Sequence, residues 1–139
     1  MLTAFYAGIF GLVHVILTLL VVRQRFKHLS LFGTVNHEGE EVRELTRTVR
    51  AHGNFVETVP IALIIMLSAE LSEVSFLYLH IGGVLLIIGR LAHGFALLKN
   101  KRMPYRPAGM ILTLLSILWL SAHALFAVDC QAVFACLGF

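Results

Sequence analysis

Long apolar segments alternate with shorter polar segments along the chain, and this pattern predicts the fold. Four apolar segments are each close to the length, about 20 residues, with which a helix crosses a bilayer. They cover residues 2–22, 55–71, 76–98 and 107–128. Two polar loops, residues 23–54 and 99–106, and one short turn, residues 72–75, connect them. The pattern predicts an all-α integral membrane protein, a bundle of four membrane-spanning helices in one domain over residues 1–139.

The composition supports a membrane protein. Hydrophobic residues make up 58% of the chain and charged residues 14%, whereas an average soluble domain is about half apolar and about one quarter charged. The first apolar segment could be mistaken for a secretion signal. A signal has basic residues before its apolar part, but here Arg23 and Arg25 follow it and no small-residue cleavage site is present. We therefore expect this segment to remain as the first span.

The basic side chains indicate the orientation of the bundle. Of the 11 Lys and Arg residues, all but Arg90 lie in the two polar loops. Because loops rich in Lys and Arg stay in the cytoplasm, both termini are expected outside it. This orientation explains the net charge of +3 without a nucleic-acid partner. Cys130 and Cys136 would then lie outside the cytoplasm, where a disulfide and a free pair are both compatible with the sequence. No metal-ligand spacing surrounds them.

A stripe of polar side chains runs from the first loop into the second apolar segment. Its members are Arg43, Arg47, Arg50, Asn54 and Glu57. Their intervals of four, three, four and three residues place them on one face of a helix. The second helix is therefore expected to begin in the cytoplasm, near Glu40 or Glu41, and to bring this polar face into the membrane. Lipid headgroups explain Arg43 and Arg47, but they do not explain the deeper Asn54 and Glu57.

The second and third apolar segments form a hairpin, so the depth of their polar residues can be compared. At about 1.5 Å per residue, Glu57 and Arg90 both lie roughly 21 Å from the turn, and Asn54 and His93 roughly 25 Å. Opposite charges at one depth can neutralise each other in lipid, so we expect Glu57 and Arg90 to pair. An ion pair alone would lock two helices together. The surplus of polar groups, with Arg50 nearby, favours a pocket for an anionic or zwitterionic ligand.

These residues form motifs that resemble a known family. The motifs are Arg50-x-x-x-Asn54-x-x-Glu57-x-x-Pro60, Gly89-Arg90-x-x-His93, and Arg106 before the fourth span. Together they resemble the MAPEG family, the membrane-associated proteins in eicosanoid and glutathione metabolism, and in particular its small bacterial branch. The resemblance covers essentially the whole chain. It implies a homotrimer in the bacterial inner membrane, with glutathione as co-substrate between adjacent subunits near the cytoplasmic side.

The resemblance also implies roles for individual residues. Five residues would bind glutathione: Arg50, Asn54, Glu57, Arg90 and His93. A cation close to the sulfur would favour the reactive thiolate, and Arg106 is the first candidate for this catalytic role, with Arg23 the second. A hydrophobic electrophile would arrive from the lipid. The implied function is that of a glutathione S-transferase of the microsomal type, or a peroxidase.

Three departures from the family pattern keep other functions open. Many members have a tyrosine at the position of Leu97, and many have polar or aromatic residues near Pro107 and Met110. Their loss favours an alternative, a glutathione-binding or structural membrane protein without turnover. A third hypothesis is a small exporter that uses Glu57 for proton coupling. A pairing of Glu57 with Arg90 would weaken it, because such exporters usually keep their carboxylate free.

Overall fold

The computed structural model describes residues 1–100 and 104–128. Cys130 and Cys136 lie outside the described residues, and so do Lys101 and Arg102. Four long helices account for most of the described chain. They are α1 (Leu2–Lys27), α2 (Arg43–Leu71), α3 (Phe76–Leu98) and α4 (Tyr105–Phe126). Each is long and apolar enough to cross a membrane, so the expected four-helix membrane fold is confirmed.

The helix ends show where polar sequence continues a span. α1 runs past its apolar segment to Lys27. α2 begins at Arg43, well before the apolar segment that starts at residue 55. The expectation that the second helix starts in polar sequence is confirmed, although the start lies two or three residues later than Glu40 or Glu41. The basic residues at the end of α1 and the start of α2 are therefore held on rigid helices rather than on a loop.

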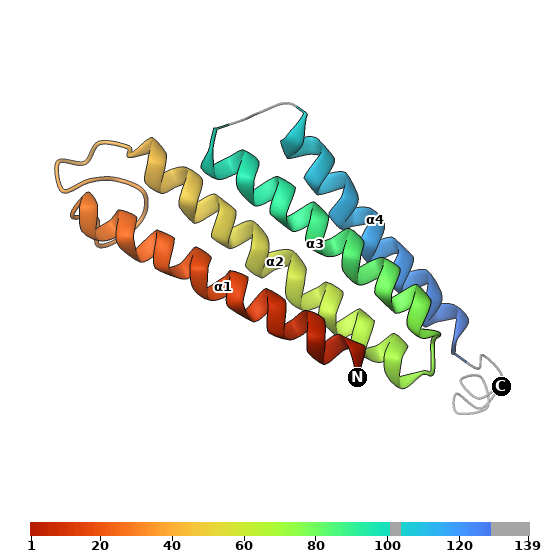
Figure 1. The fold of residues 1–139 in the computed structure, drawn as a ribbon. Helices are drawn as coiled ribbons and strands as arrows, with labels where there is room; N and C mark the ends of the chain where they lie inside the picture. The colour runs from red at the N-terminus through yellow and green to blue at the C-terminus, as the bar shows by residue number, and fades with distance from the viewer. Residues whose placement is uncertain (101–103, 129–139) are drawn as a thin grey trace, which may run out of the picture.

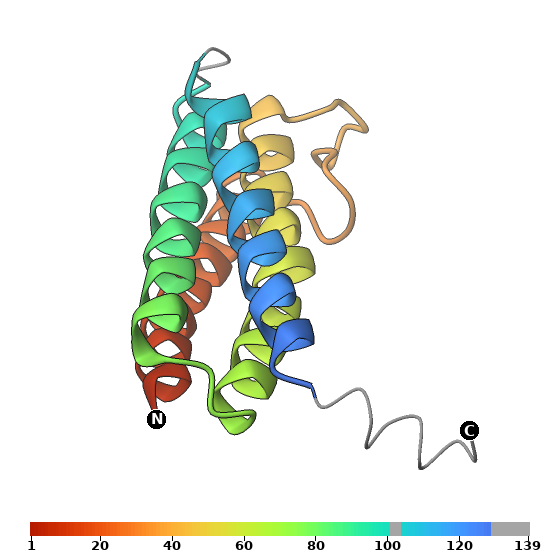
Figure 2. The same ribbon diagram turned by 90° about the vertical axis from the view of Figure 1, so that its right-hand side faces the viewer.

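The helices lie side by side and alternate in direction (Figures 1 and 2). Residues 28–42, the end of α3 and the start of α4 lie at one end of the bundle, which we call the basic end (Figure 1). The turn at residues 72–75 and the N-terminus lie at the other end. α3 packs most extensively on α4, whereas α1 packs mainly on α2. Within the described chain, the backbones of α1 and α4 are not neighbours, so the two helices lie on opposite sides of the subunit.

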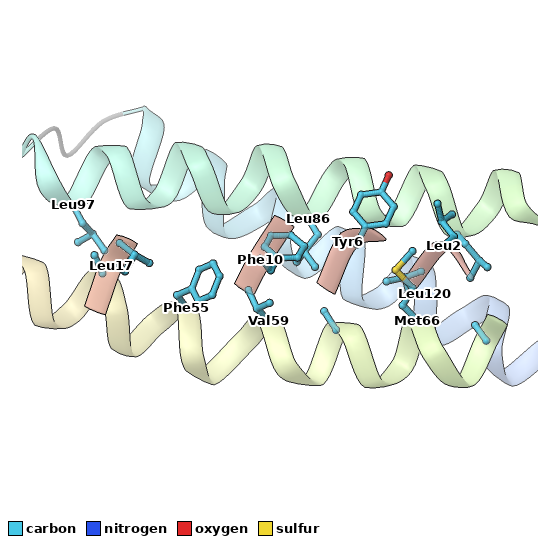
Figure 3. Close-up of a cluster of buried hydrophobic side chains, with 14 residues drawn as sticks. Leu2, Tyr6, Phe10, Leu17, Phe55, Val59, Met66, Leu86, Leu97 and Leu120 are labelled. Carbon is cyan, nitrogen blue, oxygen red and sulfur yellow. The ribbon is translucent and has the colours of Figure 1, made fainter. Parts of the chain in front are cut away.

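Apolar side chains from all four helices fill the centre of the bundle. Tyr6 and Phe10 of α1 meet Phe55 of α2, Leu86 of α3 and Leu120 of α4 in this core (Figure 3). Many other large apolar side chains are exposed on the outside of the bundle. In a membrane that outer surface faces hydrocarbon, so these exposed side chains fit a subunit that is surrounded by lipid.

Small residues allow α3 and α4 to approach closely. A Cβ atom built on Gly109 would lie 2.5 Å from the backbone nitrogen of His93. One on Gly89 would lie 2.8 Å from the backbone nitrogen of Thr113. Nearer the other end, the Ser116 hydroxyl donates to the carbonyl of Gly82 at 2.7 Å. The close contact between α3 and α4 fixes the start of α4, and with it Arg106, relative to α3.

A carboxylate joins α1 to the far end of α2. The side chain of Glu70 accepts hydrogen bonds from the backbone N–H groups of Leu2 and Thr3, the second at 2.9 Å. These N–H groups belong to the first turn of α1 and have no partner within their own helix. A negative charge is also favourable beside the positive end of the helix dipole. Glu70 therefore caps α1 and holds it in register with α2.

The glycine contact between α3 and α4 predicts how two substitutions on these helices differ. Gly109→Ala forces a methyl group into the backbone of α3, and we expect the unfolding free energy in detergent to fall by about 1–3 kcal/mol. Gly94→Ala is the matched control, because no atom lies within 4 Å of the added Cβ. Alanine favours helix over glycine by roughly 1 kcal/mol, so this variant should be no less stable. Equal loss of stability in both variants would contradict the close contact.

Candidate functional site

Glu57, the last residue of the polar stripe of α2, faces away from the core of its own subunit. Ala51, Phe55 and Val59 occupy the inner face of this helix and are buried. Glu57 follows Phe55 by two residues, about 200° around the helix, so it points to the opposite side. Glu57 is exposed and Asn54 is half-buried. The side of α2 that carries Glu57 is therefore on the surface of the isolated subunit, on a helix that is long and apolar enough to cross a membrane.

The expected pairing of Glu57 with Arg90 is wrong. Arg90 is only 4% exposed and points into the bundle, with its guanidinium carbon 5.9 Å from the centre of the Phe55 ring. In the part of the chain that the structure describes, no ion pair joins it to Glu57. Equal distance of Glu57 and Arg90 from the turn was not sufficient for an ion pair, because the two side chains lie on different sides of α2. Without this pairing, Glu57 is again compatible with a proton-coupled exporter.

Arg90 is a buried cation without a polar partner among the described residues. Its Nε and Nη1 atoms are inaccessible to solvent and have no hydrogen-bond partner among the described residues. The face of the Phe55 ring offers a cation–π contact, which replaces only part of the lost hydration. Removing water from a charged group costs free energy unless hydrogen bonds or an opposite charge replace that water. A bound anionic group near Arg90 would offset this cost.

His93 connects α3 to the start of α4. It is 3% exposed, and its Nδ1 atom lies 3.2 Å from the carbonyl oxygen of Arg106. With the proton on Nδ1, His93 donates to this carbonyl and its Nε2 becomes an acceptor. That Nε2 is buried and has no partner in the described chain, and the same is true of Asn54 Oδ1. Asn54 and His93 were expected at the same depth, but no hydrogen bond joins these two atoms in the described chain. Each atom can therefore still accept a hydrogen bond.

Three arginines from two helices meet at a pocket at the basic end. The pocket has a volume of about 150 Å³ and lies between the start of α2, the end of α3 and the start of α4. Arg47 and Arg50 come from α2 and Arg106 comes from α4. The other lining residues are Thr46, Ala96, Leu97 and Asn100. Converging arginines with few apolar neighbours are suited to bind carboxylates or phosphates.

Arg47 lines this pocket, although its place in the sequence had indicated a contact with lipid headgroups. Its Nε atom is buried and has no hydrogen-bond partner in the described part of the chain. Its position on the stripe, three residues before Arg50, was the available signal. That signal was insufficient because the pocket is completed by Arg106, which is far away in the sequence.

Arg23 does not reach this pocket within one subunit. It is exposed near the end of α1, and the backbones of α1 and α4 are not neighbours in the described structure. The two residues proposed to activate the thiol therefore lie on opposite sides of the subunit. α1 and α2 instead share a different polar contact, in which Thr18 Oγ1 and His52 Nε2 lie 3.1 Å apart. The His14 ring lies beside His52, with ring centres 5.1 Å apart.

The comparisons with known proteins decide the family. A family model described as MAPEG family matches residues 3–126. The chain belongs to the MAPEG family. Inner membrane protein YecN of Escherichia coli strain K12 is 30% identical over 135 residues, which cover 97% of this chain and 98% of that protein. Inner membrane protein YecN of Escherichia coli O6:H1 strain CFT073 gives the same values. No solved structure matches the chain significantly.

Membership in the MAPEG family confirms the resemblance carried by the motifs. The glutathione-binding and catalytic roles of Arg23, Arg50, Asn54, Glu57, Arg90, His93 and Arg106 stay predictions. The structure adds two facts to them. Arg50 and Arg106 lie at one pocket, and a single subunit leaves the outer face of α2 uncovered.

The positions of Glu57 and Arg90 predict the outcome of a double-mutant cycle. Because the two side chains do not touch, the stability changes of Glu57→Gln and Arg90→Met should add to within about 0.5 kcal/mol in the double variant. The measurement is the unfolding free energy in mixed micelles without added ligand. A coupling energy of roughly 1 kcal/mol or more would show that the ion pair exists after all.

Proposed function

We propose that this MAPEG protein is a membrane-embedded glutathione transferase or peroxidase that acts on lipophilic electrophiles. The pocket of Arg47, Arg50 and Arg106 is the observation that carries the proposal. Glutathione has two carboxylates, and arginines bind carboxylates with paired hydrogen bonds. Asn54 Oδ1 and His93 Nε2 are buried without a hydrogen-bond partner among the described residues, and they can accept hydrogen bonds from a polar ligand. Exposed Glu57 suits the amino group of the tripeptide.

We further propose that adjacent subunits of a homotrimer complete the site. The pocket of about 150 Å³ is smaller than the roughly 300–1,000 Å³ typical of ligand sites. The outer face of α2 also carries Glu57, whose exposure to hydrocarbon would be costly. A neighbouring subunit would cover this face and enlarge the pocket. It would also bring its own Arg23, which cannot approach Arg106 within one chain.

In the proposed reaction the thiolate of glutathione attacks an electrophilic carbon of a hydrophobic substrate. A carbon–sulfur bond forms, the leaving group or π bond takes up the electron pair, and the thiol proton has already passed to solvent. Arg106 lies at the pocket and is exposed, so its charge can stabilise the thiolate. Arg23 of the adjacent subunit would assist. The substrate would come from the lipid, where hydrophobic electrophiles accumulate.

The location and orientation follow from the same proposal. The two similar proteins from Escherichia coli are named as inner membrane proteins, and we infer the inner membrane for this chain as well. The basic end would face the cytoplasm, where positively charged loops are retained. Both termini would then lie outside the cytoplasm. This places the arginine pocket on the side that contains glutathione.

A second candidate function is glutathione binding without turnover. Leu97 lines the pocket, where many family members have a tyrosine, so no phenolic hydroxyl is available there to hydrogen-bond the sulfur. Normal glutathione binding without conjugation across a panel of electrophiles would select this function. Conjugation of any of them would select the enzyme.

Isothermal titration calorimetry with glutathione tests the proposal directly. Wild-type protein in detergent should bind glutathione, and the thiolate should appear in the ultraviolet spectrum on saturation. Arg106→Ala and Glu57→Ala should each weaken binding roughly tenfold or more, because each removes a charged partner. Arg106→Ala should also remove the thiolate signal.

Arg43→Ala is the matched control for these variants. Arg43 begins the same helix and is exposed, but it does not line the arginine pocket, so binding should be unchanged. If the wild-type protein shows no heat of binding, the proposed function is wrong. It is also wrong if all three variants lose affinity equally, since the pocket would then have no special role.

A further inference from the structure

The end of α1 and the segment that follows it expose large apolar side chains. Phe26 is 79% exposed, Leu29 66%, Leu31 85% and Phe32 86%. They lie at the basic end, where the chain leaves the bundle (Figure 1). A contiguous exposed apolar patch of this kind commonly marks a contact with a membrane or a partner. Neither the arginine pocket nor the family motif includes these residues.

Hydrogen bonds hold this segment in a defined shape. The backbone N–H of Ser30 donates to the carbonyl of Arg25 at 3.0 Å, and Arg25 Nη1 donates to the carbonyl of Leu31 at 3.0 Å. Further along, the N–H of Val42 donates to the carbonyl of Thr34 at 2.8 Å, which closes a short hairpin. The apolar side chains are therefore displayed by a folded segment.

A pocket of about 520 Å³ lies among these side chains. Its lining is mainly apolar and includes one cation. The lining residues are Val22, Arg25, Phe26, Leu29, Ser30 and Leu31. This volume is within the range of ligand-binding pockets. It is separate from the arginine pocket, with which it shares no lining residue.

The pocket continues the lipid-facing side of α1. A row of exposed apolar residues on this helix recurs at intervals of three, four, three and four, so its members share one face. The row consists of Leu12, Val15, Leu19, Val22 and Phe26. Its last two members also line the pocket. A hydrocarbon chain that lies along α1 in the bilayer can therefore pass into the pocket without crossing a polar surface.

The charge beside the pocket selects among lipids. Arg25 lines it and has no acidic partner in the described part of the chain. The neighbouring Lys27, in contrast, forms an ion pair, since its Nζ lies 3.0 Å from a carboxylate oxygen of Glu44. Basic side chains beside the end of a membrane helix attract anionic headgroups. Arg25 is therefore the cation in the pocket lining that can bind a lipid phosphate.

We propose that this pocket binds an anionic phospholipid from the leaflet at the basic end, with one acyl chain along α1 and the phosphate on Arg25. A lipid fits better than a second copy of the chain, because the row that leads into the pocket is wholly apolar and Arg25 beside it has no acidic partner in the described part of the chain. The polar face that needs a subunit is on α2. The proposal is independent of glutathione binding.

Fluorescence quenching by brominated lipids tests the proposal. A Phe26→Trp reporter is placed in phosphatidylcholine vesicles that contain, as about one lipid in ten, brominated phosphatidylglycerol or brominated phosphatidylcholine. The signal of the single native tryptophan, Trp119, is subtracted with wild-type protein. We expect roughly fivefold enrichment of the anionic lipid at the reporter, seen as stronger quenching by phosphatidylglycerol. Arg25→Gln should remove this difference while both lipids still quench.

Two controls make the result specific. Arg43→Gln removes another exposed cation near the basic end, outside the pocket, and should leave the difference intact. A His37→Trp reporter on the exposed hairpin tip should show no preference. Equal quenching of Phe26→Trp by the two lipids would overturn the proposal. Absence of quenching by either lipid would also overturn it, because a protein surface would then cover the pocket.

Discussion

A helix that carries charged and amide side chains on its outward face cannot leave that face in hydrocarbon. α2 is such a helix, because its inner face is occupied by Ala51, Phe55 and Val59 while Glu57 points outward. A charged residue at the centre of a membrane helix costs about 2.5–3.5 kcal/mol even on the most permissive scales. The cost is removed when protein or a polar ligand covers the face. This constraint supports the proposed assembly, in which a neighbouring subunit covers the face of α2 that carries Glu57.

The packing of the helices determines which polar groups can meet. Close contact at Gly89 and Gly109 fixes α4 on α3, and His93 contacts the carbonyl of Arg106 at the same level. α1 lies on the other side of the subunit, capped by Glu70 of α2. Arg23 near the end of α1 and Arg106 at the start of α4 are thus held on rigid helices on opposite sides of the subunit. In the proposed trimer the two sides of adjacent subunits would come together, which turns two incomplete surfaces into one binding site.

The sequence predicted the helices well because long apolar segments in a membrane have few alternatives to a spanning helix. It failed on the pairing of Glu57 with Arg90 because the rise per residue gives only the height of a side chain. The direction depends on which face of α2 packs inward, and Phe55 determines that. The spacing of two residues between Phe55 and Glu57 was a usable signal. The role of Arg47 was less accessible, because its pocket requires the start of α4 to fold back beside α2.

Cross-linking between two differently tagged chains tests the central claim that a second copy completes the site. One chain carries Arg23→Cys and the other Arg106→Cys, both with Cys130 and Cys136 replaced by serine, and a short bifunctional thiol reagent joins nearby cysteines in the membrane. We predict a product that contains both tags, because in the proposed trimer the two positions face each other only across a subunit boundary. Failure to join the tagged chains, together with efficient cross-linking inside a single chain that carries both cysteines, would contradict the account.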